Sequence, residues 1–296
     1  TVVLAYIDQD ISPVDLNNPV FMLQRELPNT KIVVRRFDAN DFRFHEAGND
    51  EGYIMSPGNF VAKYGWMGRN GRTLQVMNEP NGYANVERLV AWTVDVMRIA
   101  SSVNVSVTVM NLGVGHPNVV NPTGALEQWD VRYEPVLRAL AQYRDQHYLG
   151  LHEYLPSGNG YRVGRFTRVL ALCYKYNLRL PRIIVTEWGV DSDNGDAPKL
   201  GYKARGWSAQ RYLAEMMKAY KEVYEPWVLA GVIVGLCIFS YGNSGGWEAF
   251  DVGTDTELVN GLKIFRLLTT QEVIPVPQPD PRPVVTISGW KAATVK

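Results

Sequence analysis

The sequence predicts an α/β protein of the (β/α)8 barrel class, and three observations indicate it. Short apolar runs alternate with longer amphipathic segments along the 296 residues, which is the pattern of parallel strands joined by helices. The runs are continuously apolar, as expected of strands that are covered on both faces. Polar residues follow the ends of several runs, and in a closed barrel that end of the sheet carries the active site.

Each expected strand is a short apolar run, and each expected helix repeats its apolar residues at helical spacing. Ser56 and Pro57 are typical of a helix start, because a serine caps the first turn and proline fits its first position. The expected strands are 1–7, 31–37, 74–79, 105–111, 149–154, 182–188 and 231–241. The expected helices are 17–27, 57–66, 84–102, 132–147, 164–177, 207–224 and 256–269.

These segments make seven strand–helix units, one fewer than a complete barrel needs. We expect the missing strand either to precede residue 1 or to lie within 38–56, which otherwise forms a long loop. The competing architecture is an open doubly wound sheet. Its dinucleotide-binding form needs a glycine-rich turn after the first strand, and residues 6–13 contain no glycine. The barrel is therefore favoured, and we assign it residues 1–271.

The C-terminal segment 272–296 differs from the rest of the chain. Its prolines alternate with other residues, at positions 275, 277, 279, 281 and 283. Such a segment cannot form a helix and favours an extended conformation. It is interpreted as a strap across the barrel or as a linker to a further module. The first residue is Thr rather than Met, so we expect a processed or trimmed N-terminus.

Composition restricts the classes of function. Lys plus Arg equals Asp plus Glu, at 30 each, whereas a nucleic-acid binder needs a basic face. A local basic patch is left open by this count. No apolar run is long enough to span a membrane, and no signal peptide is visible. Cys173 and Cys237 lie in apolar runs, where buried free thiols are usual. The four histidines lack metal-ligand spacing.

Two glutamates stand directly at the ends of expected strands. Glu79 follows the run at 74–78, and Glu187 follows the run at 183–186. Each alone is equally well explained as a solvated residue at a strand end. On a barrel, however, both strand ends point to the same face, so that the two carboxylates converge. Paired carboxylates are the basic equipment of glycoside hydrolysis, in which one protonates the leaving oxygen and the other attacks or activates water.

The motifs Asn78-Glu79-Pro80 and Thr186-Glu187-Trp188-Gly189 resemble those of clan A of the retaining glycoside hydrolases. The resemblance covers most of residues 31–250. It implies a (β/α)8 barrel in which Glu79 is the acid/base and Glu187 the nucleophile. It also implies an oligosaccharide or polysaccharide substrate. We expect no cofactor and no metal. The sequence does not assign a location, and a secreted or cell-surface one is preferred to a cytoplasmic one. It assigns neither the sugar nor a family within the clan.

The resemblance extends to residues around the two glutamates. His152 and Tyr154 match a His-x-Tyr pair whose tyrosine hydrogen-bonds the nucleophile, and they share a strand face. Arg35 or Arg36 matches an early arginine that contacts the nucleophile, and Arg35 is preferred. The other expected substrate-binding residues are Asn78, which would donate to a sugar 2-hydroxyl, and the aromatic residues Trp188, Tyr241 and Trp247. Glu79, held against apolar neighbours, is expected to stay protonated near neutral pH.

Other polar residues are given structural interpretations. Glu153 alternates off the face shared by His152 and Tyr154, so it is expected in the barrel wall or in an ion pair. Asp191, Asp193 and Asp196 are expected to be solvated, and His116 either lines the cleft or has no role. Two other functions remain as alternatives. A catalytically silent carbohydrate-binding barrel would keep the aromatic residues and tolerate changes at the glutamates, and a metal-dependent barrel would need further His or Asp ligands at strand ends.

Overall fold

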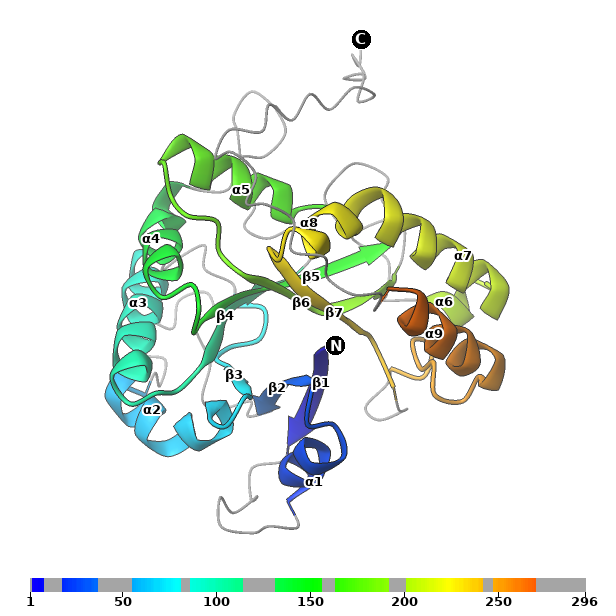
Figure 1. Cartoon of the computed structure of the whole chain (residues 1–296), viewed down its shortest axis with the longest axis horizontal. Coiled ribbons are helices and arrows are strands. Elements are labelled where there is room, and N and C mark those ends of the chain that lie inside the picture. Colours follow the sequence, from blue (N-terminus) through cyan, green and yellow to red (C-terminus); the bar gives the residue numbers. More distant parts are fainter. Residues whose placement is uncertain are drawn as a thin grey trace.

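The described part of the chain forms a parallel sheet of seven strands. A computed structural model describes residues 2–7, 18–36, 55–80, 86–113, 131–155, 163–191, 201–241 and 247–269. The strands follow one another in chain order, each pairing with the next. Figure 1 shows them in the middle of the molecule, with the helices around them. They are β1 (Val2–Ile7), β2 (Lys31–Arg36), β3 (Thr73–Gln75), β4 (Val107–Leu112), β5 (Tyr148–Leu155), β6 (Ile183–Val190) and β7 (Ile233–Ile238).

The helices are α1 (Pro19–Glu26), α2 (Pro57–Tyr64), α3 (Val86–Ser102), α4 (Glu134–Gln142), α5 (Phe166–Lys175), α6 (Gly201–Ala204), α7 (Ala209–Ala219), α8 (Glu225–Leu229) and α9 (Thr256–Thr269). Three of the helices, α1, α2 and α7, begin at a residue whose side chain caps the first turn. The side chains of Asn18, Ser56 and Ser208 each accept a hydrogen bond from a backbone N–H in the first turn of the following helix. The last residues of the predicted helix 207–224 form a π-helical turn, Tyr220–Tyr224, which leads directly into α8.

The two edges of the sheet come together, so that the strands form a nearly closed barrel. Val2 of β1 lies against Gly235 of β7, where a Cβ atom would be only 2.5 Å from the Val2 Cγ2 atom. Inside the barrel one apolar cluster draws its side chains from five strands. Its buried members are Val2, Val33, Tyr148, Ile184 and Cys237. A cluster shared by β1, β2, β5, β6 and β7 requires the sheet to curl round on itself.

An eighth strand within 38–56 stays a prediction, because residues 37–54 lie outside the described residues. In the described sheet β2 and β3 pair directly, with Val33 opposite Thr73 and Arg35 opposite Gln75. The other predicted segments agree with the structure to within a few residues, except that β3 ends at Gln75 instead of continuing to residue 79.

Several smaller predictions are also decided by the structure. Cys173 and Cys237 are both buried and free, as predicted. Among the described helices, none combines the length and the apolar character that crossing a membrane requires. The proline-rich segment 272–296 lies outside the described residues, so its interpretation as a strap or linker stays a prediction.

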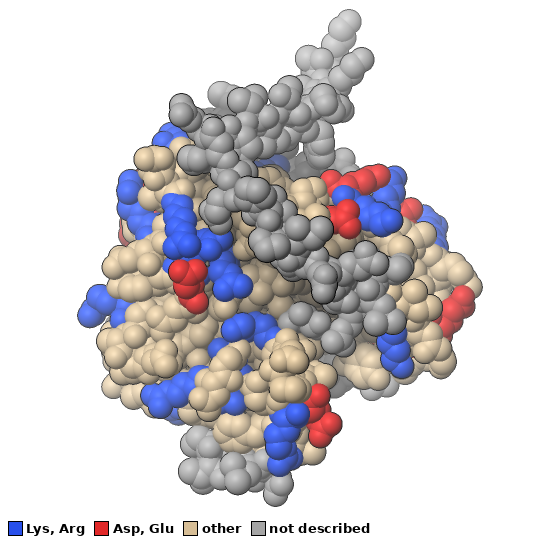
Figure 2. All heavy atoms as spheres, in the orientation of Figure 1, with Lys and Arg blue, Asp and Glu red and all other residues tan. Residues whose placement is uncertain are grey.

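Basic side chains gather at the N-terminal ends of the strands. They form a local basic patch, which a net charge of zero does not exclude. Lys31 and Arg182 both stack on the ring of Tyr148, each 5.3 Å from its centre. Burial, followed by the charges of Arg179 and Arg182, lowers the pKa of Arg144. Figure 2 shows Lys and Arg gathered on the half of one face that carries α2 to α5, where Asp and Glu are sparse. This patch lies at the opposite end of the strands from the two glutamates.

A buried histidine joins α3 to the strands and makes stability depend on pH. His147 Nδ1 accepts from the Val107 N–H at 3.3 Å, and its Nε2 lies 2.9 Å from both the Met97 carbonyl oxygen and the Ser101 hydroxyl. Burial lowers the pKa of His147 from 6.5 to about 4. Its neutral form is therefore the folded form, with the hydrogen on Nε2 donating to Met97.

We predict that His147 makes the fold less stable in weak acid. The unfolded chain binds a proton near pH 6.5 and the folded protein only near pH 4, so the stabilisation is complete above pH 6.5 and is lost as the pH falls toward 4. The loss amounts to about 3 kcal/mol of unfolding free energy. Urea unfolding of the wild type and of His147→Gln across this range measures it. A difference between the two proteins that does not change with pH would contradict the assignment.

Candidate active site

Glu79 and Glu187 lie together at the C-terminal end of the barrel. Glu187 belongs to β6, and Glu79 follows β3 by four residues. Glu79 has a left-handed backbone conformation, with φ +46°, so the chain turns at this residue. The Glu79 N–H still donates to the Asn111 carbonyl at 3.0 Å, and this bond fixes the residue beside the end of β4.

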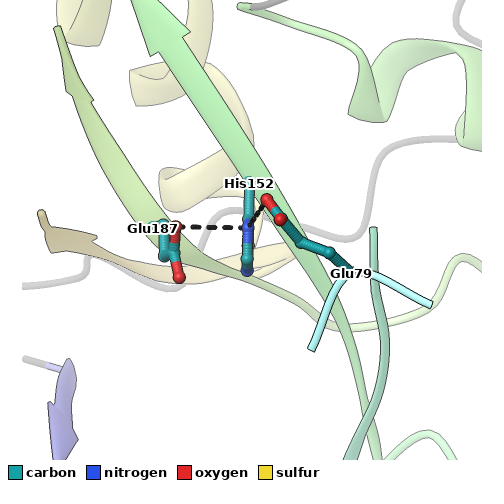
Figure 3. A group of neighbouring side chains, drawn as sticks. All are labelled: Glu79, His152 and Glu187. Atoms are coloured by element: carbon teal, nitrogen blue, oxygen red, sulfur yellow. Dashed lines mark hydrogen bonds and ion pairs between the residues drawn. The ribbon is translucent and has the colours of Figure 1, made fainter. Parts of the chain in front are cut away.

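His152 of β5 stands between the two carboxylates (Figure 3). Its Nδ1 atom lies 2.9 Å from Glu79 Oε1 and 3.2 Å from Glu187 Oε2. One oxygen of each glutamate and this nitrogen all lie within 4.8 Å of one another. The three side chains differ in exposure: His152 is fully buried, Glu187 is 7% exposed and Glu79 is 39% exposed.

The tautomer of His152 follows from its surroundings. Nδ1 faces two carboxylates, whereas Nε2 is buried and has no hydrogen-bond partner among the described residues. We assign the hydrogen of the neutral ring to Nδ1, because a carboxylate accepts and does not donate. The ring therefore stands between the two glutamates and donates toward them.

Glu187 is held by two further donors that come from distant parts of the sequence. Arg35 Nη1 of β2 lies 2.6 Å from Glu187 Oε1, and the Tyr154 hydroxyl of β5 donates to Oε2 at 2.6 Å. A guanidinium and a hydroxyl aimed at both oxygens stabilise the carboxylate form. Arg36, the alternative to Arg35 in the sequence analysis, instead stacks its guanidinium on the ring of Tyr64, 4.2 Å from its centre.

Glu79 is surrounded differently. Its side chain lies against Gly113, where a Cβ atom would be 2.8 Å from Oε1 and 3.0 Å from Cγ. Any residue larger than glycine at position 113 would therefore displace the Glu79 carboxylate. Asn78, the preceding residue, accepts a hydrogen bond from Gln75 Nε2 through Oδ1 at 3.1 Å. This bond identifies Oδ1 as the accepting end of the Asn78 side chain, so that Nδ2 is the end that can donate.

A buried network behind Glu79 was missed by the sequence analysis. Arg165 donates to the carbonyls of Leu112 and Gly113, at 3.2 and 2.6 Å, and so holds the end of β4 against Glu79. Burial lowers the pKa of Arg165, against the opposing charges of Glu153, Tyr224 and Glu79. Its sequence surroundings carry no recognisable motif, and only the fold brings it to β4.

Glu153 occupies the barrel wall, one of its two expected positions. It is fully buried and accepts from the backbone N–H groups of Gly164 and Phe166, at 2.7 and 3.1 Å, and from the Tyr224 hydroxyl. Burial raises the pKa of its carboxyl group, although these donors and Arg165 oppose the change. Glu153 therefore fixes the start of α5 and takes no part in the cleft.

The expected role of Trp188 in binding substrate is wrong. The side chain is 1% exposed and packs edge-on against Tyr224, 5.6 Å between ring centres. It stands opposite Glu153 in the β5–β6 ladder. Strand alternation directs it to the helical layer, away from the glutamates.

The other two aromatic residues lie after β7. Tyr241 is 77% exposed, and Trp247 is partly buried against Phe239 and Phe250, with ring centres 5.4 and 5.6 Å apart. Phe239 in turn packs on Tyr154, the residue that donates to Glu187. The aromatic cluster therefore adjoins the glutamates through Tyr154. His116, Asp193 and Asp196 lie outside the described residues, and Asp191 accepts at its carbonyl from Arg205.

The three side chains at the centre of the site could also hold a divalent cation. Glu79, His152 and Glu187 each offer one ligand atom within reach of the others. However, Arg35 already places a positive charge 2.6 Å from Glu187, and His152 presents a donor hydrogen where a metal needs a lone pair. The arrangement therefore suits proton transfer and attack by a carboxylate better than metal binding.

Solved structures resemble the fold at low identity. No protein-family model matches the sequence, and no curated protein matches it. The catalytic domain of a mannanase from Streptomyces sp. SirexAA-E is 17% identical with a TM-score of 0.45, over 85% of this chain and 69% of that one. A GH128 subgroup I endo-β-1,3-glucanase from Amycolatopsis mediterranei, in complex with laminaritriose, is 15% identical with a TM-score of 0.46, over 89% and 97%. A subgroup II endo-β-1,3-glucanase from Pseudomonas viridiflava is 16% identical with a TM-score of 0.42, over 88% of each chain.

Proposed function

We propose that the protein is a retaining glycoside hydrolase that cleaves an oligosaccharide or polysaccharide by double displacement. The observation that carries the proposal is the spacing of two carboxylates, with oxygens of Glu79 and Glu187 within 4.8 Å of each other. Retaining enzymes hold their carboxyl groups roughly 5–5.5 Å apart, whereas inverting enzymes leave roughly 6.5–9.5 Å for a water molecule. The short separation supports direct attack by one of the carboxylates.

The surroundings of the two glutamates support different roles. Glu187 is buried, and Arg35 and Tyr154 both donate to it, so it is kept as the carboxylate that a nucleophile must be. Glu79 is 39% exposed and is bounded by Gly113 on one side, which leaves it open toward solvent. An acid/base needs this access, since it protonates the departing oxygen and later takes a proton from water.

The reaction would proceed in two balanced steps. Glu187 attacks the anomeric carbon while Glu79 gives its proton to the glycosidic oxygen, which leaves as an alcohol. Glu79, now a carboxylate, takes a proton from water, and that water displaces Glu187 from the anomeric carbon. Each step inverts the anomeric centre, so the product retains the configuration of the substrate.

The remaining residues support sugar binding at this centre. The Asn78 amide nitrogen is oriented to donate to a 2-hydroxyl group, a contact that strengthens in the transition state. The exposed ring of Tyr241 offers an apolar face for stacking beside the cluster of Phe239, Phe250 and Trp247. A polymeric substrate would be met outside the cytoplasm, so we propose a secreted or cell-surface location.

We predict that azide separates the two glutamates. In Glu79→Ala an activated aryl glycoside still forms the glycosyl–enzyme, because its leaving group needs little protonation, and azide then releases a glycosyl azide of retained configuration. In Glu187→Ala azide enters from the vacated face and gives the inverted azide. Turnover without azide falls by at least about 10²-fold in each variant. NMR of the azide products from a panel of aryl glycosides measures the outcome.

The same experiment distinguishes the alternatives. Identical azide products from both variants would contradict the assigned roles. A wild-type protein that binds glucan, mannan, xylan or galactan fragments without cleaving any glycoside of the panel would identify the catalytically silent barrel instead.

We also predict that Gly113→Ala damages catalysis without unfolding the protein. The new methyl group would overlap the Glu79 side chain, which can move, and Gly113 does not have a positive φ that alanine would strain. A displacement of about 1 Å can cost about 10²-fold in rate. Turnover of a natural oligosaccharide should fall more than turnover of an activated aryl glycoside, because only the former depends strongly on the acid.

Gly58→Ala is the matched control, because a Cβ atom at Gly58 meets nothing within 4 Å. Its kinetics should equal those of the wild type. Equal activity of Gly113→Ala and the wild type on both substrates would contradict the contact.

A further inference from the structure

Two β-bulges lie side by side beneath the two glutamates, one on each side of β5. On β4, Val109 and Leu112 pair with Leu149 and Leu151, so that two residues of β4 stand opposite Gly150 alone. On β6, Val185 and Glu187 pair with the successive residues Leu151 and His152, which leaves Thr186 as an extra residue. Along β5 the first irregularity falls at Gly150 and the second between Leu151 and His152, so they lie within two residues of each other.

Each bulge aims one glutamate. If β6 instead continued in regular alternation through Thr186, Glu187 and Trp188 would exchange directions and the carboxylate would point to the helical layer. On β4, the bulge residues Met110 and Asn111 have φ values of +72° and +38°. This conformation turns the Asn111 carbonyl toward the chain after β3, where it accepts the Glu79 N–H at 3.0 Å.

The Asn111 side chain joins the two bulges. Its Oδ1 lies 3.4 Å from Thr186 Oγ1, whose hydroxyl hydrogen is shared with the Leu151 carbonyl of β5 at 3.3 Å, and its Nδ2 donates to the Thr108 carbonyl at 3.0 Å. It crosses β5 over Gly150, where a Cβ atom would lie 1.8 Å from Oδ1. Asn111 is fully buried. One residue therefore holds the backbone of Glu79 with its carbonyl and the residue before Glu187 with its side chain.

We propose that Asn111, through Thr186, is a positioning residue that sets the separation of Glu79 and Glu187. The inference rests on the proposed function, because that separation decides between retaining and inverting chemistry. The bulges fix two strand ends independently, and the Asn111–Thr186 bond is the side-chain link between them that spans β5. Without this bond, the end of β6 and the segment that carries Glu79 can move independently. The distances of Glu79 and Glu187 from His152 are then no longer set together.

The test removes the link from the Thr186 side. Thr186→Val is isosteric and deletes only the hydroxyl group, and Thr186→Ser restores it. Thr73→Val is the matched control: the Thr73 hydroxyl is also buried and bonds Thr108 Oγ1 at 3.0 Å, but it belongs to neither bulge. The two valine variants are expected to lose similar stability, so a difference in activity between them reports positioning.

We expect Thr186→Val to lower kcat by about tenfold to a hundredfold with little change in KM, because misplacement affects the transition state more than ground-state binding. Thr186→Ser should recover most of the loss, and Thr73→Val should keep wild-type kcat. Asn111→Gly tolerates the positive φ and keeps the backbone bond, so it should resemble Thr186→Val, and the double variant should lose no more than the single ones. Equal kcat in Thr186→Val and Thr73→Val would overturn the proposal.

A second measurement needs no substrate and so separates this inference from the proposed function. The His152 Nδ1–H lies between the two carboxylates, and its NMR resonance reports their spacing. It should move in Thr186→Val and in Asn111→Gly but not in Thr73→Val. A resonance unmoved in the first two variants would overturn the positioning role whether or not the protein hydrolyses glycosides. A moved resonance in a protein without glycosidase activity would keep the positioning role and reject the reaction.

Discussion

The arrangement of the whole site depends on the buried charge of Glu187. A carboxylate that is 7% exposed is costly unless other groups supply the hydrogen bonds that water no longer makes. Arg35, His152 and Tyr154 approach it at 2.6 to 3.2 Å. His152 and Tyr154 come from β5, the neighbour of β6, whereas Arg35 comes from β2, and only a sheet that curls into a barrel brings β2 close to β6. Closure of the barrel and ionisation of Glu187 therefore support one another.

The position of Glu79 is determined by backbone geometry rather than by charge. Glu79 has a positive φ, donates its N–H to Asn111 and packs on Gly113, which in turn is held by Arg165. These contacts restrict where the side chain stands while leaving it accessible to solvent. The contrast with Glu187 gives the two carboxylates separate tasks, because one is fixed as an anion and the other can exchange a proton with water.

The sequence predicted what depends on periodicity and strand ends. Parallel strands, their order, and Glu79, Glu187, His152 and Tyr154 as neighbours follow from continuous apolar runs that end in polar residues. Alternation along one strand also separated Glu153 from the cleft. Strand alternation failed where a β-bulge sets the direction of a side chain. Thr186 is an extra residue in β6, and nothing in the letters around it indicates that Glu187 faces inward while Trp188 packs on Tyr224.

Contacts between segments that are far apart in the sequence could not be predicted either. Arg165 begins a helix and reaches the carbonyls of β4, and Asn111 reaches across Gly150 to β6. Neither carries a motif, because their partners are backbone atoms or a small neighbour that only the fold supplies. The direct pairing of β2 with β3 also could not be predicted, since the long segment between them offered room for a further strand. Strand counting from sequence cannot tell a long loop from a short strand within it.

The central claim is that Glu187 forms a covalent bond to the sugar. Incubation with activated 2-deoxy-2-fluoro glycosides of glucose, mannose, galactose and xylose slows the second step more than the first, so that the intermediate accumulates. Mass spectrometry of the intact protein and of its peptides then locates the bond. The account predicts one added glycosyl group on the peptide that carries Glu187, at Glu187 itself. A group attached to another residue, or hydrolysis with inversion and no adduct, would contradict it.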